Sequence, residues 1–168
     1  DVDNCFDDTT YSAYLIRWDA MAPITGTSTY MYFRLLDASG TVLSDSTYTS
    51  LVIHSYVHTG GTSVPASGGT WDNDHWKMHQ DAVNLYTDLS PYYLWQGEMW
   101  LNRVQSTVWR PQAQWMCTSD SGSGGDRYIN CGHGDYGGTA VAHRGIRFYT
   151  NGGENIYSGG RVTVYGYK

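Results

Sequence analysis

The sequence predicts an all-β fold, an antiparallel jelly-roll-like β-sandwich of about eight or nine strands with long Gly-rich loops. Three observations favour this class. Apolar residues recur with a period of two, which is typical of strands with two different faces. Tyr and Trp are abundant, at 15 and 7 residues, and 20 Gly are available for turns. The length of 168 residues fits a single β-sandwich domain, 1–168, which stands alone or forms the C-terminal part of a longer chain.

The period of two is clearest in the segment Ser28–Leu36, where Met31, Phe33 and Leu35 fall on one face. A turn is expected at Asp37–Gly40, with Asp first and Gly last, followed by a returning strand. The other expected strands are Tyr11–Trp18, Thr47–Val57, Gln96–Val104, Ser106–Cys117, Thr139–Tyr149 and Arg161–Tyr167. Pro111 lies inside one of them, so we expect that strand to be an edge strand or to be broken there.

Three segments rich in Gly, Ser, Thr and Asp are predicted to be loops: Thr59–Thr70, Ser119–Asp126 and Gly132–Gly138. One turn of helix is expected within Trp71–Asp88, where Asp74 is placed to cap it, although Asp72 and Asn73 fit a turn equally well.

Composition excludes several classes of protein. The aromatic content argues against intrinsic disorder, and no run of apolar residues is long enough to span a membrane. The net charge is −6, and the ten basic residues are scattered. Because phosphate contacts need clustered Lys and Arg, we expect no nucleic-acid partner. Because the chain has no long apolar run, we expect no membrane insertion.

No pattern in the chain predicts a metal or a cofactor. His75 and His79 have the spacing of two ligands on one helix face, but the Glu of the corresponding metalloprotease motif is absent. Asp residues in the Gly-Ser segments lack calcium-loop spacing and fit turn chemistry better; they are Asp72, Asp74, Asp120, Asp126 and Asp135.

The three cysteines are Cys5, Cys117 and Cys131. A disulfide between Cys117 and Cys131 would close a short loop and is the one candidate pairing. The alternative is three free thiols, as in proteins made in a reducing compartment.

Six of the seven Trp lie between residues 71 and 115. Aromatic faces stack on sugar rings, so we take Trp71, Trp76, Tyr92 and Trp95 as candidate glycan-binding residues. The alternative is that these side chains belong to the core or to a subunit interface.

Catalysis has little support in the sequence. The chain has only two Glu, Glu98 and Glu154, and no strand carries a pair of them. A small glycan hydrolase that uses Glu98 is therefore the weakest of the functional alternatives.

Both ends of the chain carry a more specific pattern. The first end reads Phe6-Asp7-Asp8-Thr9-Thr10-Tyr11, with Tyr14 and Ile16 following, and then Phe33-Arg34-Leu35-Leu36-Asp37-Ala38-Ser39-Gly40. The last reads Ile146-Arg147-Phe148, then Ile156-Tyr157-Ser158-Gly159-Gly160, and ends with Val164-Tyr165-Gly166. This pattern resembles a β-sandwich module of tailed-bacteriophage virion proteins, over roughly residues 5–57 and 139–168.

The resemblance implies a non-enzymatic structural protein on the exterior of a phage particle. Modules of this kind occur as head fibres, capsid decoration proteins and the C-terminal domains of tail fibres or spikes, commonly as homotrimers. The implied partners are further copies of the chain, other virion proteins and a glycan of the host cell surface. The motif is structural, so it assigns no catalytic residue. A free carbohydrate-binding module remains the alternative.

Overall fold

The computed structural model describes residues 1–7, 10–21, 31–45, 47–57, 63–78, 95–120, 127–150 and 159–168. These residues form ten strands in two antiparallel sheets, and no helix occurs among them. The expected all-β antiparallel sandwich is thus confirmed. None of the described segments is a helix that could cross a bilayer.

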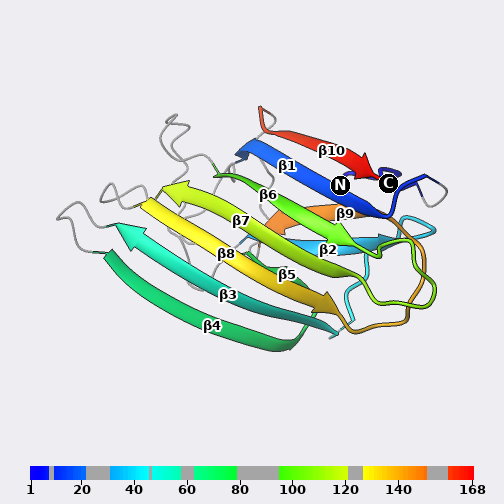
Figure 1. Cartoon of the computed structure of the whole chain (residues 1–168), viewed down its shortest axis with the longest axis horizontal. Coiled ribbons are helices and arrows are strands. Elements are labelled where there is room, and N and C mark those ends of the chain that lie inside the picture. The colour runs from blue at the N-terminus through cyan, green and yellow to red at the C-terminus, as the bar shows by residue number, and fades with distance from the viewer. Residues whose placement is uncertain are drawn as a thin grey trace.

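The larger sheet has seven strands and lies in front of the smaller sheet in Figure 1. Its strands, in spatial order, are β10 (Arg161–Tyr167), β1 (Ala13–Met21), β6 (Trp95–Asn102), β7 (Gln112–Asp120), β8 (Arg127–Tyr136), β3 (Tyr48–Val57) and β4 (Ser63–Asn73). The smaller sheet has the order β5 (Trp76–Lys77), β2 (Met31–Asp37) and β9 (His143–Thr150).

The core lies between the two sheets, and strand alternation decides which side chains enter it. On β2, Met31, Phe33 and Leu35 are fully buried, as their spacing predicts. Leu36 is buried as well, although it lies on the opposite face. The N-terminal segment approaches this face, because the Val2 carbonyl and the Asp3 α-carbon lie beside Gly145, the β9 partner of Leu36, on the same side as the Leu36 side chain.

Three tryptophan rings in the core occupy space that inward-facing glycines leave free. The pairs are Trp18 over Gly97, Trp115 over Gly132 and Trp76 over Gly134. A β-carbon at any of these glycines would overlap the ring of its partner. The glycines therefore serve packing rather than turns.

Two expected loops contain strands instead. Residues 63–70 belong to β4, an edge strand that pairs with β3, and residues 132–136 belong to β8, between β7 and β3. Small residues are typical of turns, which is why the sequence predicts loops there, whereas the β8 glycines accommodate aromatic rings. In the third expected loop, residues 119 and 120 end β7, and residues 121–126 lie outside the described part.

The remaining local expectations have different outcomes. Residues 71–78 contain no helical turn; the rest of that candidate helix, from residue 79 on, lies outside the described residues. The Asp37–Gly40 turn is confirmed, since the Gly40 amide donates to the Asp37 carbonyl at 3.0 Å and Gly40 has a φ of 84°. The strands expected at Gln96–Val104 and Ser106–Cys117 pair with each other as β6 and β7, but β7 begins only after Pro111, so residues 106–111 belong to the connecting loop and the expected break at Pro111 is found.

Candidate functional site

The structure separates the tryptophans into core and surface residues. Trp76 and Trp95 are buried, at 0% and 1% exposure, so they cannot present a ring to a sugar in solution. For these two, the glycan-binding prediction is wrong and the core alternative holds. The Trp71 side chain and Tyr92 lie outside the described residues.

A different set of aromatic side chains faces solvent, on the outer face of the seven-stranded sheet. We call it the aromatic platform: Trp100 on β6 with Tyr165 and Tyr167 on β10. Leu15 on β1 is the cross-strand partner of both Trp100 and Tyr165. Leu15 is buried yet is not part of the core between the sheets, which shows that outward-facing rings cover it. The rings of Trp100 and Tyr165 therefore pack over the Leu15 side chain, which fixes their position on the sheet.

The rings of the platform form a continuous surface with a polar edge. The ring centroids of Trp100 and Tyr167 are 4.9 Å apart, with their planes tilted by 50°. Arg17 lies 6.0 Å from the Tyr165 centroid and donates to the Glu98 carboxylate at 3.2 Å. Both side chains of that ion pair are solvent-accessible, so it contributes little to stability, and its groups are available to a ligand.

A shallow pocket of about 340 Å³ adjoins the platform. Arg17, Glu98 and Tyr165 line it, together with Asp19 and Arg161. Aromatic rings stack on the C–H faces of sugars, while guanidinium and carboxylate groups bind hydroxyls. An aromatic surface beside a pocket of charged groups is thus suited to a carbohydrate.

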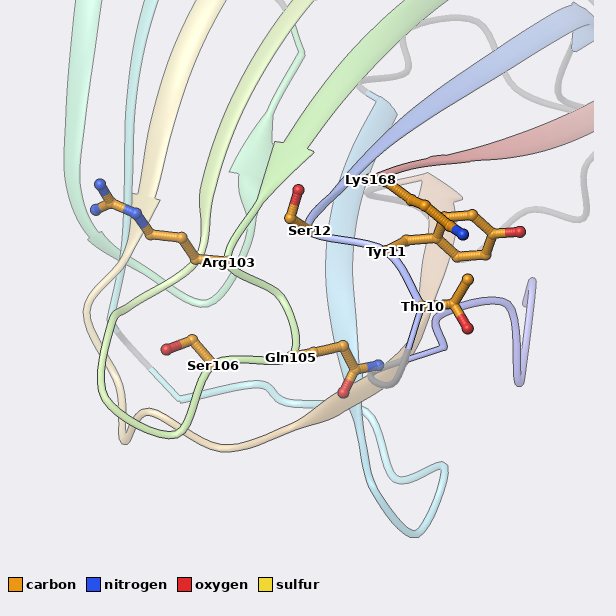
Figure 2. Close-up of a pocket in the computed structure, with 7 residues that line it drawn as sticks. All are labelled: Thr10, Tyr11, Ser12, Arg103, Gln105, Ser106 and Lys168. Carbon is orange, nitrogen blue, oxygen red and sulfur yellow. The ribbon is translucent and has the colours of Figure 1, made fainter.

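A wider hollow of about 740 Å³ lies at the end of the sandwich where the β6–β7 loop meets the approach to β1. Figure 2 shows its lining residues: Thr10, Tyr11, Ser12, Arg103, Gln105, Ser106 and Lys168. Gln105 donates to the His143 carbonyl at 2.6 Å, and the Arg103 guanidinium lies 5.5 Å from the Trp109 centroid. Tyr11 is the one aromatic side chain among the described residues that line the hollow, so the hollow offers less ring surface to a sugar than the platform with its three rings.

The histidine and aspartate candidates do not converge on a metal. His75 stacks on Tyr32, with centroids 3.7 Å apart, and binds Asp74, which also pairs with Arg34. Burial lowers the pKa of His75 to about 4, helped by the charges of Arg34 and Lys77. His79 is outside the described residues, within which no group of three or more His, Cys, Asp or Glu is placed to hold a metal ion.

The calcium candidates are scattered in the same way. Asp135 on β8 accepts a hydrogen bond from the Gln112 side chain at 2.8 Å, and it lies near His133. Asp126 and the side chains of Asp72 and Asp120 are outside the described part of the structure.

The three cysteines are free thiols, which agrees with the second of the two sequence alternatives. Cys117 pairs with Asn130 across β7 and β8, and Cys131 pairs with Met116, so the two side chains point to opposite faces of the sheet. This geometry does not bring Cys117 and Cys131 together for a disulfide. Burial raises the pKa of Cys117 to about 12, whereas Cys131 is exposed on the outer face.

Comparison of the chain with protein-family models, curated proteins and solved structures gives no match. Sequence reasoning missed the platform because it followed the cluster of Trp residues along the chain. The signal that could have found it is strand alternation, which places Trp100 on the same face as the polar Gln96 and Glu98.

Proposed function

We propose that the chain is a non-enzymatic structural protein on the exterior of a tailed-bacteriophage particle, either decorating the capsid or forming a fibre or spike module that contacts the host surface. The support is the resemblance of its two ends to such modules. The observation that carries the proposal is that the described residues of this end pattern pair with one another across the two ends of the chain, as a frame.

The frame joins the two ends of the chain. β1 pairs with β10, and β2 pairs with β9, so each N-terminal motif strand lies beside a C-terminal one. Within the first motif, the Tyr14 hydroxyl donates to the Asp7 carbonyl and accepts from the Asp7 amide, both at 2.6 Å. Tyr11 lies against Gly166, where a β-carbon would overlap its ring.

Such a frame suits a module that must stay rigid outside a cell. Two bidentate ion pairs fasten the N-terminal segment to β9: Asp1 with Arg147, and Asp3 with Arg144. In this proposal the protein assembles as a homotrimer and contacts other virion proteins.

The aromatic platform supplies the contact with the host. A surface of three half-exposed rings beside Arg17 and Glu98 favours a cell-surface glycan as the ligand. The same observation favours a second candidate, a free carbohydrate-binding module that is not part of a particle.

Particle association is the test that separates the two candidates. Particles are purified from the source whose genome encodes the chain, and the chain is sought by mass spectrometry and by immunogold labelling of intact particles. The proposal predicts the chain in stoichiometric amounts, with gold on the outside. If the chain binds a glycan array but is absent from the particles, the free-module candidate replaces the virion proposal.

A further inference from the structure

The outer face of the seven-stranded sheet is hollowed on both sides of Glu98. The pocket of about 340 Å³ beside the platform is lined by residues of β10, β1 and β6, and a second hollow of about 270 Å³ is lined by residues of β6 and β7. Gln96, Gly97 and Glu98 line both, so the two hollows adjoin. We call the pair the cross-strand groove. It crosses three inter-strand spacings of about 4.8 Å, or about 14 Å in all, which is more than one sugar ring occupies.

The strand register places the rings of the platform along one side of the groove. Tyr165, Leu15 and Trp100 are direct cross-strand partners, so they form one row on the outer face. Two residues further along each strand lies a parallel row that lines the groove, made up of Thr163, Arg17, Glu98 and Met116. A sugar chain that lies across the strands can therefore stack on the first row and hydrogen-bond to the second.

An irregularity of the backbone coincides with the groove. The pairing of β1 with β6 shifts in register between Trp18 and Met21, and Ala20 has a φ of 53°. Residues other than glycine rarely adopt this left-handed conformation. A bulge bends its strand, and bulges are frequent next to functional sites. Trp18 and Asp19, which directly precede Ala20, line the groove.

The charges along the groove are balanced. The register places Arg17 opposite Glu98, and Arg161 opposite Asp19, and all four residues line the groove. Two guanidinium and two carboxylate groups offset each other, and the net charge of −6 on the chain repels a polyanion. These groups supply both donors and acceptors, which suits hydroxyl groups, since a hydroxyl donates and accepts.

We infer that the aromatic platform and the cross-strand groove together bind a stretch of several sugars within a neutral polysaccharide, which lies across the strands. The length of the groove accounts for several sugars, and its balanced charge selects against acidic chains. An extended peptide fits less well, because β1, β6 and β7 are paired on both sides and have no free edge for it. The inference rests on the proposed glycan contact and names the class of glycan.

The first test uses an array of bacterial surface polysaccharides on which neutral and acidic chains are compared. Fragments of increasing length are then prepared from the neutral chain that binds, and their affinities are measured by calorimetry. We expect the longest fragment to bind at least about tenfold more tightly than the disaccharide, because further sugars reach the β7 end of the groove. The affinity should change little between about 0.1 M and 1 M salt, a range over which attraction between charges is screened.

The second test uses substitutions at the β7 end of the groove. Thr118→Ala and Gln96→Ala each remove a polar group that lines the groove, and both should weaken binding of the longest fragment about two- to tenfold. Thr49→Ala is the matched control, because Thr49 is a half-buried threonine like Thr118, on the same face of the sheet but on β3, outside the groove. Circular dichroism checks that each variant is folded.

The outcomes separate this inference from the proposed function. Acidic chains that bind as tightly as neutral ones, equal affinities for the disaccharide and the longest fragment, or unchanged affinities in both groove variants would overturn the inference and leave the glycan contact standing. If no polysaccharide on the array binds, the proposed glycan contact fails and the inference fails with it.

Discussion

Gly134 on β8 provides a sharp test of how the core is packed. A β-carbon at this position would lie 2.5 Å from Cδ1 of Trp76, 2.7 Å from Nε1 of the same ring, and 2.7 Å from the Thr49 carbonyl oxygen. Carbon atoms in good contact are about 3.5–4.0 Å apart, so alanine overlaps its neighbours by about 1 Å. The ring is fully buried, and its N–H donates to the Asp135 carbonyl at 3.2 Å.

Neither neighbour can move at low cost, because the Thr49 carbonyl belongs to the paired strand β3. Overpacking a core costs about 1–3 kcal/mol, and we expect Gly134→Ala at the upper end. Without a clash, the same change would stabilise the protein by about 0.4–1 kcal/mol through the unfolded chain. A decrease in the free energy of unfolding therefore indicates a clash with the Trp76 ring, and an increase indicates open space at Gly134.

Urea unfolding followed by circular dichroism measures the change. For a slope of about 2 kcal/mol per molar urea, a loss of about 3 kcal/mol lowers the midpoint by about 1.5 M. The control is His133→Ala, the preceding residue, whose side chain lies on the opposite, outer face. A midpoint for Gly134→Ala at or above that of the wild type would refute the packing of Trp76 described above.

Two further predictions concern buried polar groups. Burial lowers the pKa of His143 below its usual value of 6.5, so the unfolded chain takes up the proton first, and the free energy of unfolding should fall as the pH drops through about 6.5 and below. The urea midpoints at about pH 7.5 and pH 5.5 should therefore differ less in His143→Gln than in the wild type. An equal difference in the two proteins would contradict this prediction. The hydroxyl of Tyr48 accepts from the Leu35 amide at 3.0 Å and donates to the Leu43 carbonyl at 3.1 Å. Tyr48→Phe should therefore cost about 1–3 kcal/mol in the same assay, whereas an unchanged midpoint would show that these bonds are not needed.

Much of the fold could be predicted from local sequence. Alternation identified β2 and its buried residues, and the turn at Asp37–Gly40 follows from residue types alone. β4 and β8 could not be predicted in this way, because their small residues are equally typical of loops. In β8, the role of Gly134 depends on Trp76, which lies 58 positions earlier in the sequence.

The candidate site shows the same limit. Clustering of Trp along the chain indicated where aromatic side chains are abundant, but not which of them face solvent. Trp95 is buried and Trp100 is exposed although both lie on β6, because the two residues differ by an odd number of positions. Tyr165 and Tyr167 join the site only through the pairing of β10 with β1, a contact between the two ends of the chain.

The most direct test of the central claim is the glycan affinity of Trp100→Ala beside that of Trp109→Ala. Binding is first detected with an array of bacterial surface polysaccharides, and the affinity for the bound glycan is then measured by calorimetry. Trp109 is the more exposed of the two residues, at 63% against 36%, but it lies in the loop before β7 and outside the platform. We predict that Trp100→Ala weakens binding by at least about tenfold, or 1.4 kcal/mol, while Trp109→Ala binds like the wild type. Equal affinities for the wild type and Trp100→Ala, or a loss confined to Trp109→Ala, would contradict the assignment of the aromatic platform as the contact surface.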